Sequence, residues 1–289
     1  MNRKLTTNSR LVNELFANYI STFTAFCELI NNSIQAKAKN IWIEIDYADE
    51  MEVTTTIIKK VIIKDDGIGV HVSDVDRKLL DIGTTNKEGG KGIGRFASFQ
   101  LGKRVTIESI AYSDNEKSFS KVKIPLHFDM FGKNLNVSEI KIDTEEDILK
   151  GKGHTPYYKV EIDELYSSII TDKEPRKKII DKFLKNNIND AIFEKYPLKI
   201  FNQDISVFIN DVKIKPEDFI VDKPIVNIHD FTDLKGHEHK VVFNYINIKR
   251  LDKIKVFLTI NNAGIQTIAN GFEFDANWLS PKIGGWYIY

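Results

Sequence analysis

The first half of the chain shows helical periodicity in one segment and strand periodicity in several others. Residues 21–37 carry apolar side chains at every third or fourth position, which predicts an amphipathic helix with one buried face; residues 8–19 predict a helix before it. Elsewhere apolar and polar residues alternate, which is typical of a strand with one buried face. The predicted strands are residues 40–47, 54–66, 104–112, 119–128 and 157–165, and the buried helical stripe consists of Phe23, Phe26, Ile30 and Ile34.

Between these strands lie two segments that are less regular. Residues 72–81 predict a short helix, and residues 83–94 are too rich in glycine for either a helix or a strand. A further helix is predicted to begin near Ile93 and to end at Gly102, which would serve as its C-terminal cap.

The character of the chain changes after residue 166. Residues 172–196 predict one charged amphipathic helix entered through Pro175, and short strands such as "ISVFIN" and "KIKVFLTINN" follow. We therefore expect an α+β protein with two domains, because 289 residues suffice for two ordinary cores. The predicted division is residues 1–166, a connecting helix over residues 167–196, and a smaller α/β domain over residues 197–289, incomplete at its C-terminus.

Composition and charge exclude several classes of protein. The 41 basic residues balance the 41 acidic ones, so net charge does not favour nucleic acid or an anionic membrane as partner, although a local basic patch stays compatible with it. The single cysteine, Cys27, excludes an internal disulfide framework and a multi-cysteine zinc site. The sequence has no signal-peptide pattern and no apolar run of membrane-spanning length, so we expect a cytoplasmic protein with no membrane partner.

The glycine-rich segment "GGKGIG", residues 89–94, is typical of a phosphate-binding loop, but two familiar loops do not fit it. No glycine is followed by four residues and then Gly-Lys-Ser/Thr, so the sequence has no P-loop. "GIGRFA" matches the dinucleotide fingerprint, yet it follows a loop where that fingerprint requires a strand. The remaining interpretation is a loop whose backbone N–H groups surround phosphates.

Three motifs in order carry a family resemblance. They are Glu28 and Asn32 within "ELINNSIQA", the turn "DDGIG" with Asp65, Gly67 and Gly69, and the loop with Gly89, Gly92 and Gly94. The set resembles the GHKL ATPase superfamily, which includes gyrase B subunits, MutL proteins, the ninety-kilodalton heat-shock chaperones, MORC proteins and sensor histidine kinases. The resemblance implies a Bergerat fold, an α/β sandwich in which helices cover one face of a mixed sheet, and it is nearest in look to the chaperone, MutL and MORC branch.

The resemblance also implies a role for each motif residue. Asp65 would accept a hydrogen bond from the exocyclic amine of adenine, and Gly69 would keep the space beside the base free. Asn32 would be the protein's ligand to Mg²⁺, and Glu28, one helical turn away, would accept a proton from the water that attacks the γ-phosphate. For any one of these residues alone, an ordinary turn or an exposed helix position is the better explanation.

The same resemblance makes residues 83–94 a lid over the phosphates of ATP. Gly92 and Gly94, with Ile93 between them, would bring backbone amides to the phosphates, and Lys87 or Lys91 would add charge. Thr155 would belong to a water network around adenine, although His154 interrupts the family's glycine-threonine pair. Gln35 is another departure, because many members have aspartate there.

The second half resembles the transducer domain that follows the ATPase in gyrase, MutL and the chaperones. In that domain a basic residue normally reaches the γ-phosphate, and by chain order it is expected beyond residue 289, so we expect a fragment of a longer protein.

Two functions follow as hypotheses. In the first, Mg²⁺ and ATP close the lid, slow hydrolysis follows, and two copies pair as an ATP-dependent homodimer within a larger chaperone-, MutL- or MORC-like machine. That machine could belong to bacterial defence or act on DNA. In the second, the chain is a nucleotide-sensing interaction module that binds ATP with little turnover. A third interpretation, a nucleic-acid-binding protein, is disfavoured by the neutral charge.

Overall fold

The computed structural model describes most, but not all, of the chain. The chain divides into two compact units, one of residues Met1–Asn187 with Ile205–Lys213 and one of residues Ile188–Asp204 with Ile214–Tyr289. The predicted helix at residues 8–19 lies outside the described residues. Described residues are 2–4, 6–7, 22–47, 58–82, 94–131, 140–151, 153–166, 180–223, 225–248, 255–260, 263–267 and 285–288.

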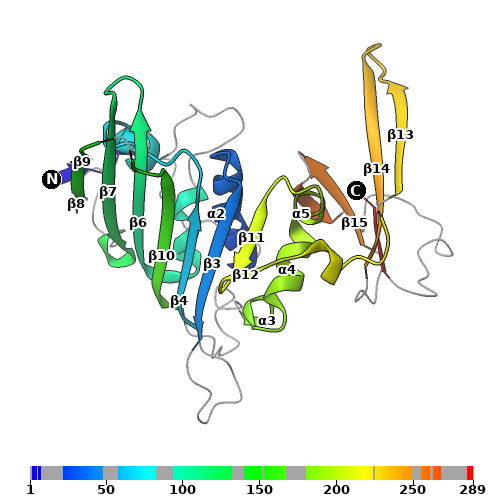
Figure 1. Ribbon diagram of the computed structural model, residues 1–289, viewed down its shortest axis with the longest axis horizontal. Helices are drawn as coiled ribbons and strands as arrows, with labels where there is room; N and C mark the ends of the chain where they lie inside the picture. Colours follow the sequence, from blue (N-terminus) through cyan, green and yellow to red (C-terminus); the bar gives the residue numbers. More distant parts are fainter. Residues whose placement is uncertain are drawn as a thin grey trace, which may run out of the picture. The chain divides into compact units, whose positions relative to one another are not determined.

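An eight-stranded mixed sheet is the centre of the first unit (Figure 1). Its strands lie in the order β12-β11-β3-β4-β10-β6-β7-β9, and all neighbours are antiparallel except β11 and β3. The mixed sheet with few helices confirms the predicted α+β class. The strands are β3 (Asn40–Tyr47), β4 (Ile58–Asp65), β6 (Gly102–Ser113), β7 (Ser118–His127), β9 (Glu145–Leu149), β10 (Tyr157–Leu165), β11 (Ser206–Ile209) and β12 (Val212–Lys213).

One face of this sheet is apolar because the buried residues of neighbouring strands stand opposite one another. Ile43 of β3 pairs with Ile63 of β4, and Ile63 pairs with Val160 of β10. Helix α2 (Thr22–Gln35) lies against this face and buries the predicted residues Phe23, Phe26 and Ile30. Ile34 is only half-buried, whereas Ser33 is buried in its place.

The long helix predicted over residues 172–196 is wrong where the structure describes it. A short helix α3 (Ile180–Phe183) ends in a turn, in which the N–H of Asn187 donates to the carbonyl of Leu184 at 2.9 Å. Helix α4 (Ile188–Lys195) then begins in the second unit. The sequence "LKNN" explains the interruption, because asparagine side chains compete for backbone hydrogen bonds and favour turns.

The contacts of Phe183 show that α3 packs within the first unit. Its ring contacts Phe23 and Phe26 of α2 edge-on, with centroids 5.7 and 5.0 Å apart. The hydroxyl of Tyr47 donates to the carbonyl of Phe183 at 2.6 Å, and burial raises the pKa of Tyr47 to about 12. The chain therefore returns to the core of the first unit before it enters the second.

The two other segments of the first unit that were predicted as helices form 3₁₀ and π turns in place of α-helices. Residues 72–81 form a 3₁₀ turn η1 (Val72–Asp74) and a π turn η2 (Asp76–Leu80), followed by β5 (Asp81–Ile82). The helix expected to end at Gly102 is a 3₁₀ helix η3 (Gly94–Gln100). Gly102 is the first residue of β6 and not a cap, and a Cβ there would lie 2.5 Å from the carbonyl oxygen of Asp163 on β10.

The hairpin of β11 and β12 joins the first sheet although the sequence places it in the second domain. Val207 and Ile209 of β11 stand opposite Ile41 and Ile43 of β3 and are buried with them. A short apolar strand carries no local signal for the sheet that it joins, so only the parallel pairing with β3 reveals this. The roles of the predicted domains stay a prediction.

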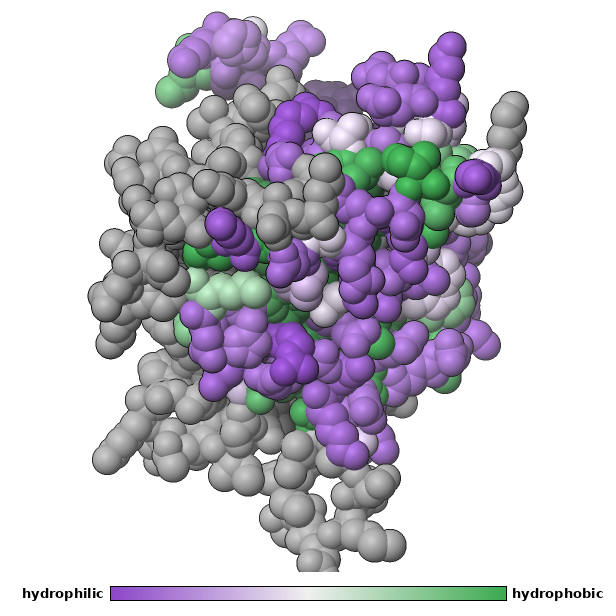
Figure 2. All heavy atoms as spheres, turned by 90° about the vertical axis from the view of Figure 1, so that its left-hand side faces the viewer, coloured by the Kyte–Doolittle hydropathy of each residue, from purple (hydrophilic) through white to green (hydrophobic). Residues whose placement is uncertain are grey.

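Small additional elements complete the first unit, and charged residues lie on β9, one of the two edge strands of its sheet. On β9, Glu145 and Asp147 are exposed, and Lys123 of β7 lies 3.1 Å from Glu145. On the side of the molecule that carries this edge, the residues that are coloured in Figure 2 are mostly hydrophilic. Charged edge residues disfavour pairing with a foreign strand. The additional elements are β1 (Asn2–Lys4), paired with β8 (Lys141–Asp143), β2 (Thr6–Thr7), paired with β5, and η4 (Phe128–Phe131).

The second unit contains helix α4, helix α5 (Pro197–Phe201), the turn η7 (Pro216–Asp218) and a five-stranded sheet. Phe193 of α4 stacks on Phe219 with centroids 4.3 Å apart. None of the helices in the described ranges is long and apolar enough to cross a bilayer. The strands of the sheet, in the order β13-β14-β17-β15-β16, are β13 (Ile225–Thr232), β14 (Glu238–Ile248), β15 (Lys255–Ile260), β16 (Ala263–Thr267) and β17 (Gly285–Ile288).

Candidate functional site

Asp65 is a buried carboxylate at the C-terminal end of β4, and only 1% of its surface is exposed. The hydroxyl of Ser33 donates to its Oδ2 at 2.7 Å, and the N–H of Gly67 donates to its Oδ1 at 2.9 Å. Burial raises the pKa of Asp65, and the negative charge of Asp66 adds to this, while the two hydrogen bonds act in the opposite direction. Each carboxylate oxygen keeps a further lone pair, so Asp65 can accept another donor from a ligand.

Ser33 is a site residue that sequence reasoning missed. It lies on α2 three residues after Ile30 and seven after Phe26, on the apolar side of the helix, and it is buried there. A polar group among buried apolar positions requires a hydrogen-bond partner, and here that partner is Asp65. The position of a serine within the apolar stripe is the sequence signal that could have identified it.

Gly67 and Gly69 allow the turn after β4 to pass between α2 and the neighbouring strands. A Cβ at Gly67 would lie 2.8 Å from the carbonyl oxygen of Ala36, at the end of α2. Gly69 has a positive φ of 64°, and a Cβ there would lie 2.3 Å from the carbonyl oxygen of Ile110 on β6. Both glycines are therefore required by backbone packing, a reason additional to the space for a base that the sequence suggests.

Asp66 has a structural role, in contrast to its neighbour Asp65. Its Oδ1 accepts the N–H groups of Lys39 and Asn40 at 2.7 and 2.9 Å, and its Oδ2 accepts the side-chain amide of Asn40 at 2.7 Å. Burial acts to raise the pKa of Asp66, but these hydrogen bonds outweigh it and lower the pKa. Asp66 thereby holds the connection between α2 and β3 and leaves Asp65 as the carboxylate of the site.

Glu28 and Asn32 lie one turn apart on α2, and both side chains are half-buried. The side-chain amide of Asn31 donates to Oε1 of Glu28 at 3.4 Å. Asn32 carries an amide oxygen on this half-buried part of the helix surface. Asn32 precedes Ser33, the partner of Asp65, so α2 brings the metal candidate and the carboxylate to the same end of the helix. The neighbouring Gln35 is exposed.

Ser109 of β6 is a second polar residue that the sequence analysis missed. It is fully buried; its hydroxyl donates to the carbonyl of Tyr157 at 2.9 Å and accepts the N–H of Val70 at 2.8 Å. Ser109 and Asp65 both pair with Tyr158 of β10, so they belong to one row across the buried face of the sheet. Thr155 lies two residues before β10 and is exposed. Ser109 belongs to the buried row of β6 with Val105, Ile107 and Ala111, and a serine in such a row is the sequence signal that could have identified it.

The predicted lid lies mostly outside the described residues. Lys87, Gly89, Lys91, Gly92 and Ile93 belong to this part, so their roles stay predictions. Gly94 begins η3, and η3 packs against α2. The C-terminal end of the predicted lid is therefore attached to the helix that carries Glu28 and Asn32.

The donor and acceptor groups of this site suit an adenine nucleotide with a magnesium ion. Asp65 can accept hydrogen bonds, as the amine of adenine requires. A magnesium ion bound through triphosphate oxygens and water needs few protein ligands, and the amide oxygen of Asn32 is of the right chemical type. Glu28 on the same helical face supplies a carboxylate that can accept a proton.

Comparison with known families agrees with this chemistry. Residues 20–150 match the sequence model of a family described as histidine kinase-, DNA gyrase B-, and HSP90-like ATPase. This range contains α2, the turn after β4 and the glycine-rich loop. A comparison with curated proteins gave no match.

Proposed function

Residues 20–150 belong to the GHKL ATPase superfamily, and we propose on this basis that the chain binds ATP with Mg²⁺ at the C-terminal end of β4 and hydrolyses it slowly. The observation that carries the proposal is the buried carboxylate of Asp65, which two internal donors hold in place while it retains free acceptor positions. The family supports ATP binding, and the residue roles and the turnover are our proposal.

In the proposed reaction the residues of α2 act on the phosphate end of the nucleotide. Mg²⁺ supplies charge neutralisation between the phosphate oxygens when it is bound. The amide oxygen of Asn32 would hold the metal, and Glu28 would orient the attacking water and accept its proton. Most of the rate enhancement in such reactions comes from positioning and electrostatics. The proton acceptor therefore supplies a smaller part of the rate enhancement than the lid and the metal.

The lid and the second unit extend this proposal to the whole chain. Lys87 and Lys91, with the amides around Gly89, Gly92, Ile93 and Gly94, would close over the phosphates, and Thr155 would act through a water beside the base. We propose that the closed state favours pairing of two copies and that the second unit acts as a transducer in a larger machine. We place the protein in the cytoplasm. Binding of the nucleotide can shift the chain toward the paired state only if that state binds it more tightly.

Turnover and binding by a Glu28→Ala variant test the proposal. We expect phosphate release to fall by at least about a hundredfold, the contribution typical of a proton acceptor, while the affinity for an ATP analogue stays within about threefold, because Glu28 acts on the water and not on the base. Glu44→Ala is the matched control, since Glu44 is an exposed glutamate on β3. A wild-type rate that is already negligible, and that neither substitution changes, would support a nucleotide sensor in place of a hydrolase.

Pairing is tested separately by the molar mass in solution. Light scattering with and without a non-hydrolysable ATP analogue and Mg²⁺ should show a dimer only with the nucleotide. A mass that stays monomeric at saturating analogue would contradict the clamp while leaving ATP binding intact.

A further inference from the structure

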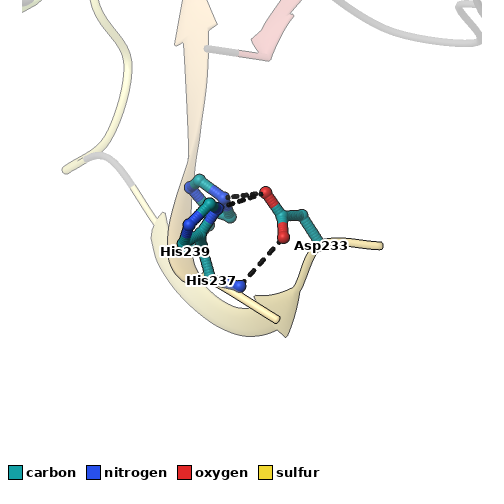
Figure 3. A group of neighbouring side chains, drawn as sticks. All are labelled: Asp233, His237 and His239. Carbon is teal, nitrogen blue, oxygen red and sulfur yellow. Dashed lines mark hydrogen bonds and ion pairs between the residues drawn. The ribbon is translucent and has the colours of Figure 1, made fainter. Parts of the chain in front are cut away.

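Three metal-binding side chains meet at the turn between β13 and β14, in the second unit. Nδ1 of His237 and Nε2 of His239 each lie 3.1 Å from the same oxygen, Oδ2 of Asp233 (Figure 3). The three candidate ligand atoms all lie within 4.8 Å of one another. His237 immediately precedes β14 and His239 is the second residue of that strand, and both imidazoles are directed to Asp233.

The turn itself explains only part of this arrangement. The N–H of Gly236 donates to the carbonyl of Asp233 at 3.0 Å, and Gly236 has a positive φ of 83°, as in a type I turn followed by a glycine bulge. Oδ1 of Asp233 accepts the N–H groups of Lys235 and His237 at 2.8 and 2.9 Å. The backbone of the turn thus uses Oδ1 alone and requires neither imidazole. The convergence of two histidines on Oδ2 needs a separate explanation.

We propose that Asp233, His237 and His239 form a binding site for a divalent transition-metal ion of the zinc type. Zinc binds imidazole nitrogen at about 2.0–2.1 Å and carboxylate oxygen at about 2.0–2.2 Å, so tetrahedral ligand atoms are about 3.3–3.5 Å apart. The observed separation of 3.1 Å between Oδ2 and each nitrogen needs to widen by only a few tenths of an ångström. The two imidazole nitrogens lie within 4.8 Å of each other and have to approach to the same separation, by up to about 1.5 Å, through rotation of these exposed side chains.

The surroundings orient two of the three ligands. The amides that bind Oδ1 hold the carboxylate of Asp233, and the ring of His239 stacks on Phe231 with centroids 5.1 Å apart. Groups that orient metal ligands in this way normally strengthen metal binding.

The donor set selects the class of ion. Two imidazole nitrogens and one carboxylate suit Zn²⁺, Co²⁺, Ni²⁺ or Cu²⁺, whereas Mg²⁺ and Ca²⁺ prefer oxygen ligands throughout. Three ligands from the protein leave a fourth position for water or for a group of another molecule. His127 provides a contrast: its two ring nitrogens face different carboxylates, those of Asp129 and Glu164, and one imidazole between them forms no chelate.

Calorimetric titration of the chain, prepared without a histidine tag, with ZnCl₂ tests the site. We expect one equivalent to bind, and His237→Ala or His239→Ala to weaken binding at least about tenfold, because loss of even an outer-shell group costs ten- to a hundredfold. His229→Ala is the matched control, since His229 is an exposed histidine on β13 of the same hairpin, outside the cluster, and it should leave affinity within about twofold.

The absorption spectrum with Co²⁺ tests the wild-type chain without any substitution. A visible band that saturates at one equivalent and disappears on addition of Zn²⁺ is expected for the three proposed ligands. No saturable binding of either ion by the wild type would overturn the proposal. Binding that survives both alanine substitutions would equally overturn it. Thermal unfolding in EDTA verifies that each variant is folded, and these exposed positions are expected to tolerate the change.

Discussion

Asp65→Asn separates the role of Asp65 in binding from its role in the fold. The substitution replaces an acceptor-only carboxylate with an amide of nearly the same shape, so one of its two terminal atoms becomes a donor. If the amine of adenine donates to Asp65, the variant loses a hydrogen bond to a charged group. That loss costs about 1.5–3 kcal/mol, or about ten- to a hundredfold in affinity.

The surroundings of Asp65 can pair the oxygen and one N–H of an asparagine side chain. The N–H of Gly67, 2.9 Å from Oδ1, keeps its acceptor. The new amide can donate to the oxygen of Ser33, whose hydroxyl then donates to the carbonyl of Leu29, already 3.3 Å away. The pair of Ser33 and residue 65 therefore stays connected in the variant.

The pKa of Asp65 gives the direction of the effect on stability. Burial raises this pKa above its ordinary value of 3.8, so the folded state holds its proton more tightly than the unfolded chain. The corresponding stabilisation is fully present below pH 3.8 and is lost as the pH rises through the folded-state pKa. Ionised Asp65 thus opposes folding at neutral pH, and we expect Asp65→Asn to have a free energy of unfolding no lower than that of the wild type.

The assay combines calorimetric titration of a non-hydrolysable ATP analogue with Mg²⁺ and urea denaturation of both proteins. GTP is the matched ligand, because guanine presents an acceptor where adenine presents an amine donor, so the wild type should prefer ATP and the variant should lose that preference. An affinity of Asp65→Asn within about twofold of wild type would refute the assignment of Asp65 to adenine. Loss of binding with a large loss of stability would show that Asp65 acts through the fold instead.

Two further predictions concern the turn after β4 and the residues that follow it. Gly69→Ala should lower the free energy of unfolding, measured by urea denaturation, by at least about 1 kcal/mol more than Gly151→Ala. Both glycines have positive φ, but a Cβ at Gly69 would lie 2.3 Å from the carbonyl oxygen of Ile110, whereas a Cβ at Gly151 would meet no atom within 4 Å. Equal losses would contradict the clash. His71 is buried, and burial lowers its pKa below 6.5. The part of the free energy of unfolding that comes from this shift is present above pH 6.5 and should be lost as the pH falls through the folded-state pKa. His71→Gln should therefore flatten the fall of stability between about pH 7.5 and about pH 5.5, whereas the exposed-site variant His229→Gln should not, and parallel curves for all three proteins would refute this.

The sequence by itself determined those features that depend on periodicity along a single segment. The strands β3 and β10 have the bounds predicted for them, and α2 lies within the segment predicted for it, because one buried face imposes a period on the residues that form it. The motif residues Glu28, Asn32 and Asp65 were found through the resemblance of three ordered motifs to a known ATPase family, and the family match covers all three.

Only the tertiary structure decided what these segments meet. It assigned β11 to the first sheet, divided the helix predicted over residues 172–196, and brought Ser33 to within 2.7 Å of Asp65 across 32 positions of sequence. It also directed His237 and His239 to a single oxygen of Asp233. Periodicity states which face of a segment is buried, but the partner of a buried polar group depends on register and packing between segments, which are not local properties of the sequence.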